Sequence, residues 1–90
     1  MVAAGVDVGA ETVKVVLLSD SKILGSSIVR GGLDRSKSAE EAMEKALQSA
    51  GIARKDVKRT VATGIGRKEV AFADQVATEI AADARGATWL

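Results

Sequence analysis

An acidic residue, a glycine and a lysine lie close together near the start of the chain. Asp7 ends an apolar run, Gly9 follows it, and Lys14 comes after a polar break. A glycine lets the backbone bring its N–H groups close to a phosphate, and a lysine adds a point charge. Mg²⁺ prefers a carboxylate and keeps several waters, so Asp7 suits it. These residues predict a magnesium-phosphate site, although a plain β-hairpin with a solvated Lys14 explains the same pattern.

A second candidate loop follows an apolar run later in the chain. It contains Gly64 and Gly66, and Arg67 comes directly after them. Two glycines at the end of a strand leave room for a ligand, and the arginine is placed to contact it. A tight loop between a strand and a helix would need the same glycines. The residues of this loop leave both interpretations open.

Composition excludes several other kinds of chemistry. The formal net charge is +1, and acidic and basic residues are interspersed, so no basic face is available for nucleic acid. The chain has no cysteine and no histidine, which removes disulfides and the usual metal clusters from it. The apolar start is interrupted by Asp7 and Glu11, before the ~20 residues that a membrane span needs. We therefore expect a cytoplasmic protein.

Four runs rich in β-branched residues predict the strands that position these loops. They cover residues 3–8, 13–18, 22–30 and 60–63, and the first three are separated by short polar or glycine-containing breaks. The fourth run is reached through a helix, so we expect it to pair in parallel with the first. The resulting sheet is mixed.

Helical periodicity predicts two helices. The first starts at Ser38, which forms a capping box with Glu41, and ends at Gly51. The second covers about residues 73–85, with Gly86 as its stop. The order is then βββαβα, a single α/β unit over residues 1–90. Asp74 is expected on the exposed side of the second helix.

Three motifs together resemble one protein family. They are Gly5–Gly9 with Lys14, the loop 62–67, and residues 72–74 followed by 78–80 and 84–87. Their order and spacing, over nearly the whole chain, resemble the ATP-dependent activators of 2-hydroxyacyl-CoA dehydratases, a family that includes the ATPase subunits of benzoyl-CoA reductase. The resemblance implies a ribonuclease H-like, actin-like ATPase fold whose halves close on ATP. The βββαβα order matches the start of such a half.

The resemblance also implies roles for individual residues. Asp7 would hold Mg²⁺ through water, while the turn at Gly9, Ala10 and Thr12 would face the nucleotide phosphates together with Lys14. Gly64, Gly66 and Arg67 would lie beside the same nucleotide. In that family a dimeric activator with a shared [4Fe-4S] cluster uses ATP hydrolysis to drive a low-potential electron into a partner dehydratase or reductase. The cluster cysteines would lie downstream, because this chain has none.

Two departures from the family pattern and one apparent truncation limit this interpretation. Ala10 and Glu11 stand where a pair of hydroxyl residues is common, so Thr12 would supply the hydroxyl. Ala82 and Asp83 stand where many members carry Cys-His. The chain stops before the family's next central strand, which predicts an N-terminal fragment, inactive alone, with an open sheet edge prone to self-association or strand exchange.

Two other functions remain open on the sequence. The first phosphate loop is shared by other actin-like ATPases and small-molecule kinases, so the chain is also compatible with one of these. Ala10 and Glu11 are also compatible with a non-catalytic interaction domain that keeps the fold and has lost nucleotide binding.

Overall fold

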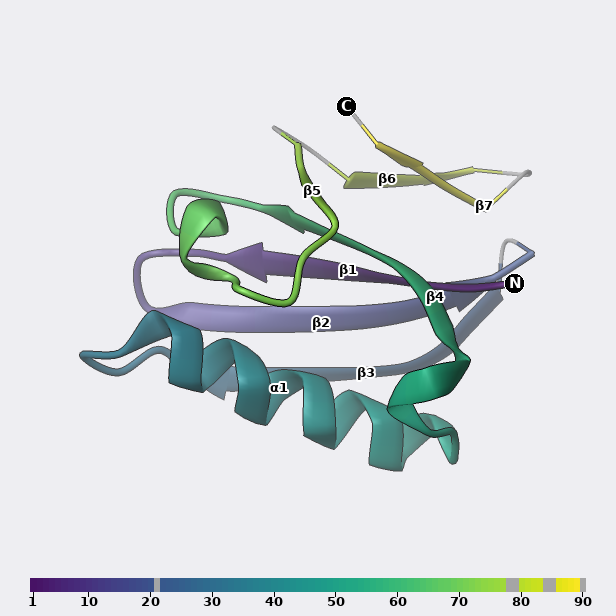
Figure 1. Cartoon of the computed structure of the whole chain (residues 1–90), viewed down its shortest axis with the longest axis horizontal. Coiled ribbons are helices and arrows are strands. Elements are labelled where there is room, and N and C mark those ends of the chain that lie inside the picture. The colour runs from purple at the N-terminus through teal and green to yellow at the C-terminus, as the bar shows by residue number, and fades with distance from the viewer. Residues whose placement is uncertain (21, 78–79, 84–85, 90) are drawn as a thin grey trace.

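The computed structural model describes residues 1–20, 22–77, 80–83 and 86–89. Its first three strands, β1 (Val2–Val8), β2 (Thr12–Ser19) and β3 (Lys22–Arg30), form an antiparallel meander. All three predicted strands are therefore confirmed, with their ends moved by at most one residue. Figure 1 shows the meander as the lower part of a larger sheet.

Alternation along these strands gives the sheet one apolar face. In β1, Ala4, Val6 and Val8 are fully buried, whereas Asp7 between the last two is exposed. Val13, Val15 and Leu17 repeat the same spacing in β2. Because successive side chains of a strand point to opposite faces, these residues form one continuous apolar surface that a helix can cover.

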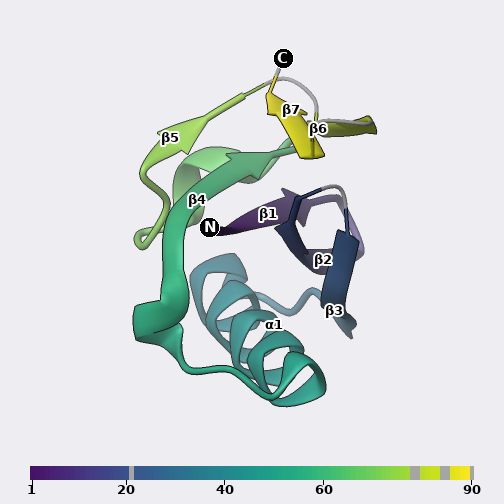
Figure 2. The same ribbon diagram turned by 90° about the vertical axis from the view of Figure 1, so that its right-hand side faces the viewer.

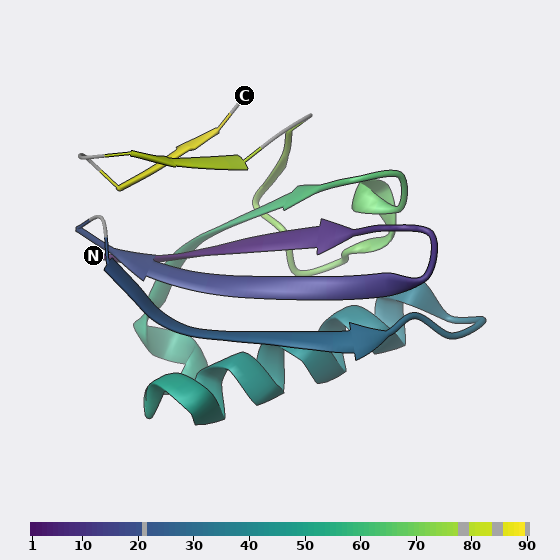
Figure 3. The same cartoon turned by 180° about the vertical axis from the view of Figure 1, so that it is seen from behind.

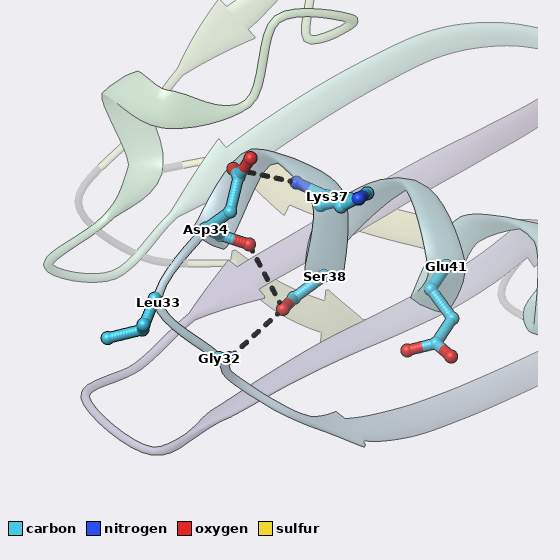
Figure 4. Close-up of a pocket in the computed structure, with 6 residues that line it drawn as sticks. All are labelled: Gly32, Leu33, Asp34, Lys37, Ser38 and Glu41. Atoms are coloured by element: carbon cyan, nitrogen blue, oxygen red, sulfur yellow. Dashed lines mark hydrogen bonds between the residues drawn. The ribbon is translucent and has the colours of Figure 1, made fainter.

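The covering helix is α1 (Arg35–Ala50), and it begins one turn earlier than predicted. Its N-cap is Asp34, whose side chain accepts a hydrogen bond from the Lys37 N–H at 3.1 Å (Figure 4). The prediction that Ser38 caps the helix with Glu41 was wrong. Ser38 is buried inside the helix, where its hydroxyl donates to the Asp34 carbonyl and accepts from the Gly32 N–H. Asp34 is an equally good capping residue and adds a turn to the helix.

Helix α1 packs its apolar stripe onto the sheet and ends as predicted. The buried stripe consists of Ala39, Ala42, Met43, Ala46 and Leu47. Gly51 takes the left-handed conformation, with φ 70°, and its N–H bonds to the carbonyls of Leu47 and Gln48. Among the described residues, no helix is long and apolar enough to cross a membrane.

The chain returns to the sheet through a short 3-10 turn, η1 (Arg54–Asp56), and enters β4 (Val57–Thr63). This strand runs parallel to β1, as predicted, and lies on the opposite side of β1 from β2. A second 3-10 turn, η2 (Arg67–Glu69), follows the glycine loop. The strand order is β3-β2-β1-β4-β5, where β5 (Gln75–Val76) is a short strand at the edge, so the predicted mixed sheet is confirmed.

The helix predicted over residues 73–85 is wrong in the part of the chain that the structure describes. The residues there form β5 (Gln75–Val76) and β6 (Ile80–Asp83), and Gly86 opens β7 (Gly86–Trp89) instead of ending a helix. Residues 78–79 and 84–85 of the predicted helix lie outside the described residues. The free edge of β4 explains the difference, because its Thr60 and Ala62 carbonyls accept from the N–H groups of Asp74 and Ala77.

Asp74 fixes the start of this edge pairing. Its carboxylate accepts a hydrogen bond from the Thr60 N–H at 2.7 Å, so Asp74 is bonded to the edge of β4. The prediction that Asp74 lies on the exposed side of a helix was wrong. The β6–β7 hairpin then lies on the side of the sheet away from α1 (Figure 2). Figure 3 shows it toward the N-terminal end of β1, which leaves the opposite, carboxyl end of that strand uncovered by the hairpin.

Candidate functional site

The predicted site lies where the parallel strands β1 and β4 end together. Asp7 is in register with Thr63 of β4 on one side and with Lys14 of β2 on the other. These three residues share the face of the sheet away from α1, because their neighbours Val6, Val8 and Val13 face the helix. Asp7 and Lys14 are exposed, so a carboxylate and an ammonium group are both presented to a ligand.

The turn between β1 and β2 is short and closed by backbone hydrogen bonds. The Gly9 N–H donates to the Thr12 carbonyl at 2.9 Å, so this N–H holds the turn together. Ala10 is exposed at the tip, and Thr12 is exposed at the first position of β2. The structure thus places Gly9, Ala10, Thr12 and Lys14 in and beside this turn, and their predicted contact with nucleotide phosphates stays a prediction.

The glycine loop after β4 packs directly against the end of β1. Gly64 has φ 93°, a conformation that favours glycine, and a Cβ there would lie 2.7 Å from Oδ1 of Asp7. Gly66 donates its N–H to the Val8 carbonyl at 3.1 Å, and a Cβ on it would come within 2.9 Å of the Arg35 side chain. Two loops that are over 50 residues apart in sequence therefore meet at the Asp7 carboxylate.

Arg67 is brought to the same loop but turns back onto it. Its guanidinium Nη1 donates to the Gly64 carbonyl at 2.9 Å, and its backbone N–H also donates to that carbonyl. The arginine thereby helps to hold Gly64 in its left-handed conformation. Its predicted contact with a ligand stays a prediction.

Two residues near the site, Thr63 and Arg30, were not among the predicted site residues. Thr63 is only 6% exposed, and within the described part of the chain its hydroxyl has no hydrogen-bond partner. Arg30 is in register with Thr12 and lines, with Ala10, Glu11 and Gly31, a hollow of about 320 Å³. Thr63 lies within the motif 62–67, but only the pairing of strands places it beside Asp7 and places Arg30 beside Thr12.

The residues present fit a magnesium-bound phosphate. Across the described ranges of the chain, no three histidine, cysteine or acidic side chains cluster to hold a metal ion, and Asp7 contributes one exposed carboxylate at this end of the sheet. Mg²⁺ bound to a nucleotide needs only one or two protein carboxylates, because phosphates and waters supply its other ligands. The buried Thr63 hydroxyl, which has no hydrogen-bond partner among the described residues, also suits a closely approaching ligand.

Comparison with known families agrees with this geometry. The model of the BadF/BadG/BcrA/BcrD ATPase family matches residues 4–90. The chain belongs to this family. The resemblance stated from the three sequence motifs is therefore confirmed, and so is the class of fold that it implied.

Characterised relatives of this family member are activator proteins. The activator of lactoyl-CoA dehydratase from Anaerotignum propionicum is 36% identical over 91 residues, which cover 100% of this chain and 35% of the relative. The activator of 2-hydroxyisocaproyl-CoA dehydratase from Clostridium difficile, solved with bound ADPNP, matches with a TM-score of 0.75 and 31% identity. That match covers 84% of this chain and 28% of the activator.

A more distant structure shows the fold alone. The ROK hexokinase from Thermus thermophilus matches with a TM-score of 0.60 and 20% identity, over 71% of this chain and 22% of the hexokinase. The sheet and helix of this chain thus have a fold that is also found in this hexokinase. The chain spans about a third of the length of the curated activator that it matches.

Proposed function

We propose that this chain is the segment of an activator ATPase that binds the phosphates of Mg-ATP, and that the complete protein uses ATP hydrolysis to drive electron transfer into an acyl-CoA dehydratase or reductase. One observation carries the proposal: the glycine loop after β4 packs on the carboxylate of Asp7 at the open ends of β1 and β4. Membership of the ATPase family, and relatives that are activators, support the same function.

Each residue of the site has a distinct task in this proposal. Asp7 holds the magnesium ion through its water shell, since an exposed carboxylate can accept hydrogen bonds from metal-bound water. Lys14, in register beside Asp7, neutralises phosphate charge. Gly64 lets the loop after β4 pack directly on Val8 and Asp7, where any side chain would clash, and Arg67 holds that glycine in place.

The remaining parts of the function lie beyond what this chain carries. With no cysteine in the sequence, a [4Fe-4S] cluster would be held by downstream residues, where the cluster would supply the electron. The partner would be an acyl-CoA dehydratase or reductase, and the protein would act as a dimer in the cytoplasm. The link to benzoyl-CoA reductase rests on the family alone.

Calorimetric titration of the longest natural form of the protein with Mg-ATP tests this function. We expect Asp7→Asn to weaken Mg-ATP binding by roughly tenfold or more, because the charge that holds the metal shell is removed. Asp7 is exposed, so the melting temperature without nucleotide should hardly change.

Asp20→Asn is the matched control. Asp20 is an exposed aspartate in the turn between β2 and β3, at the other end of the sheet from Asp7. This variant should bind Mg-ATP like the unmodified protein. Absence of Mg-ATP binding by the unmodified protein would refute the proposal and favour an interaction domain that has lost its nucleotide.

A further inference from the structure

We propose that Thr63 is a ligand-binding residue of this site and that its hydroxyl donates a hydrogen bond to a phosphate oxygen of the bound Mg-nucleotide. This inference rests on the proposed function and assigns to it a residue at the end of β4. It starts from one feature of the structure: the Thr63 hydroxyl is buried and, among the described residues, has no hydrogen-bond partner.

An unpartnered buried hydroxyl is unusual. Buried polar side chains are nearly always hydrogen-bonded, because a hydroxyl that loses water without gaining a partner is unfavourable. A threonine in a strand could be replaced by valine, which has the same shape and no hydroxyl to satisfy. The hydroxyl therefore contributes nothing evident to the folded state, which points to a partner that arrives with a ligand.

The position of Thr63 identifies that ligand. Thr63 lies directly beside Asp7 in the parallel pair β1–β4, so both side chains emerge from the same face at the same end of the sheet. The next residue is Gly64, whose backbone packs so closely on the end of β1 that a Cβ there would lie 2.7 Å from Oδ1 of Asp7. Whatever Asp7 binds must therefore approach the Thr63 hydroxyl.

The chemistry of the three side chains is complementary. Asp7 can only accept hydrogen bonds and repels a phosphate that is not paired with a metal ion. Lys14 offers a mobile charge on a long chain. Thr63 offers a neutral donor on a short, stiff side chain at the end of β4, where it is in register with Asp7 of β1. Such a donor fixes the position of a phosphate oxygen without adding charge.

The experiment compares Thr63→Val with Thr63→Ser in the longest natural form of the protein. Valine removes the hydroxyl and keeps the shape, whereas serine keeps the hydroxyl and removes a methyl group. For each variant, calorimetry measures Mg-ATP and Mg-ADP affinity, and thermal unfolding without nucleotide measures stability. Neither reading depends on ATP hydrolysis.

We expect Thr63→Val to bind both Mg-nucleotides roughly tenfold more weakly, because a hydrogen bond to a charged group is lost. Its melting temperature without nucleotide should be unchanged or higher, because an unsatisfied hydroxyl has been removed. Thr63→Ser should bind like the unmodified protein. This combination cannot come from a structural role, which would lower stability and binding together.

Two results would overturn the inference about Thr63, and a third would overturn the proposed function on which it rests. Thr63→Val could bind Mg-nucleotide as tightly as the unmodified protein while Asp7→Asn does not, which would leave the proposed function standing without Thr63. A lower melting temperature for Thr63→Val than for Thr63→Ser would assign the hydroxyl to folding. If the unmodified protein binds no Mg-ATP, the proposed function fails and the inference fails with it.

Discussion

The two faces of the central sheet are built from the same strands, but one is buried and the other is exposed at the carboxyl end of β1. On the face under α1, Val6 and Val15 are fully buried against Met43 and its neighbours. On the other face, at the carboxyl end of β1, Asp7 and Lys14 are exposed, and Ile28 beside them is 63% exposed. One face is closed by packing, and the other is left open at the end where the loops meet.

This difference in burial shows where polar side chains can stand without disturbing the core. Side chains in a strand alternate between faces, so a carboxylate at Asp7 disturbs nothing in the core formed by Val6 and Val8. The core face supplies most of the stability, and the open face can be shaped for a ligand. Substitutions on the two faces should therefore have different consequences.

The largest stability effect is expected on the core face. Met43→Ala should lower the free energy of unfolding by about 2–5 kcal/mol, because a fully buried side chain is lost and a cavity remains. Its matched variant on the open face, Ile28→Ala, should cost less than about 0.5 kcal/mol. Urea unfolding of both variants measures the contrast. Equal losses would mean that the open face is covered as well as the core face.

An intermediate effect on stability is expected at Gly64, where the loop after β4 packs on the end of β1. Gly64→Ala should lower the free energy of unfolding by about 2–4 kcal/mol, because alanine is strained at φ 93° and its Cβ would press on Asp7 and Val8. It should also abolish Mg-ATP binding in calorimetry.

Gly51→Ala is the control for backbone strain alone. Gly51 also has positive φ, but a Cβ there would meet no atom within 4 Å. Its loss should be only about 1 kcal/mol, and nucleotide binding should be unaffected. If the two glycine variants lost equal stability, the close packing of Gly64 on the end of β1 would be refuted.

The smallest effect is expected at the start of α1, beyond the sheet itself. Asp34→Ala should lower the free energy of unfolding by about 1 kcal/mol, because the cap on the Lys37 N–H is lost. Asp34→Asn should be nearly neutral, since asparagine caps equally well. Urea unfolding measures both. No loss in Asp34→Ala would restore Ser38 as the capping residue.

Much of the fold could be predicted from local patterns. The first four strands and the end of α1 at Gly51 follow from β-branched runs, helical spacing and a glycine stop, all of which act over a few residues. The start of α1 was missed because Asp34 and Ser38 are both good caps. The difference was decided by burial: Ser38 lies within α1 on its buried side, and its hydroxyl accepts a hydrogen bond from the Gly32 N–H.

The part of the chain from Ala73 onward could not be predicted in this way. Alanine-rich spacing from Ala73 onward fits a helix, yet Asp74 and Ala77 bond to the free edge of β4. A backbone edge with unpaired carbonyls is a feature of the assembled sheet, and no local propensity contains it. Tertiary pairing overrode the helical pattern.

The sequence by itself determined the family, the mixed sheet and the loops at Asp7 and Gly64, because these depend on residue types at fixed local spacings. Only the tertiary structure decided that these loops touch, and that the Thr63 hydroxyl is buried beside Asp7 with no hydrogen-bond partner among the described residues. The physical reason is strand register. A sequence shows which residues a strand contains, whereas the neighbour of each residue depends on how separate strands align when the sheet forms.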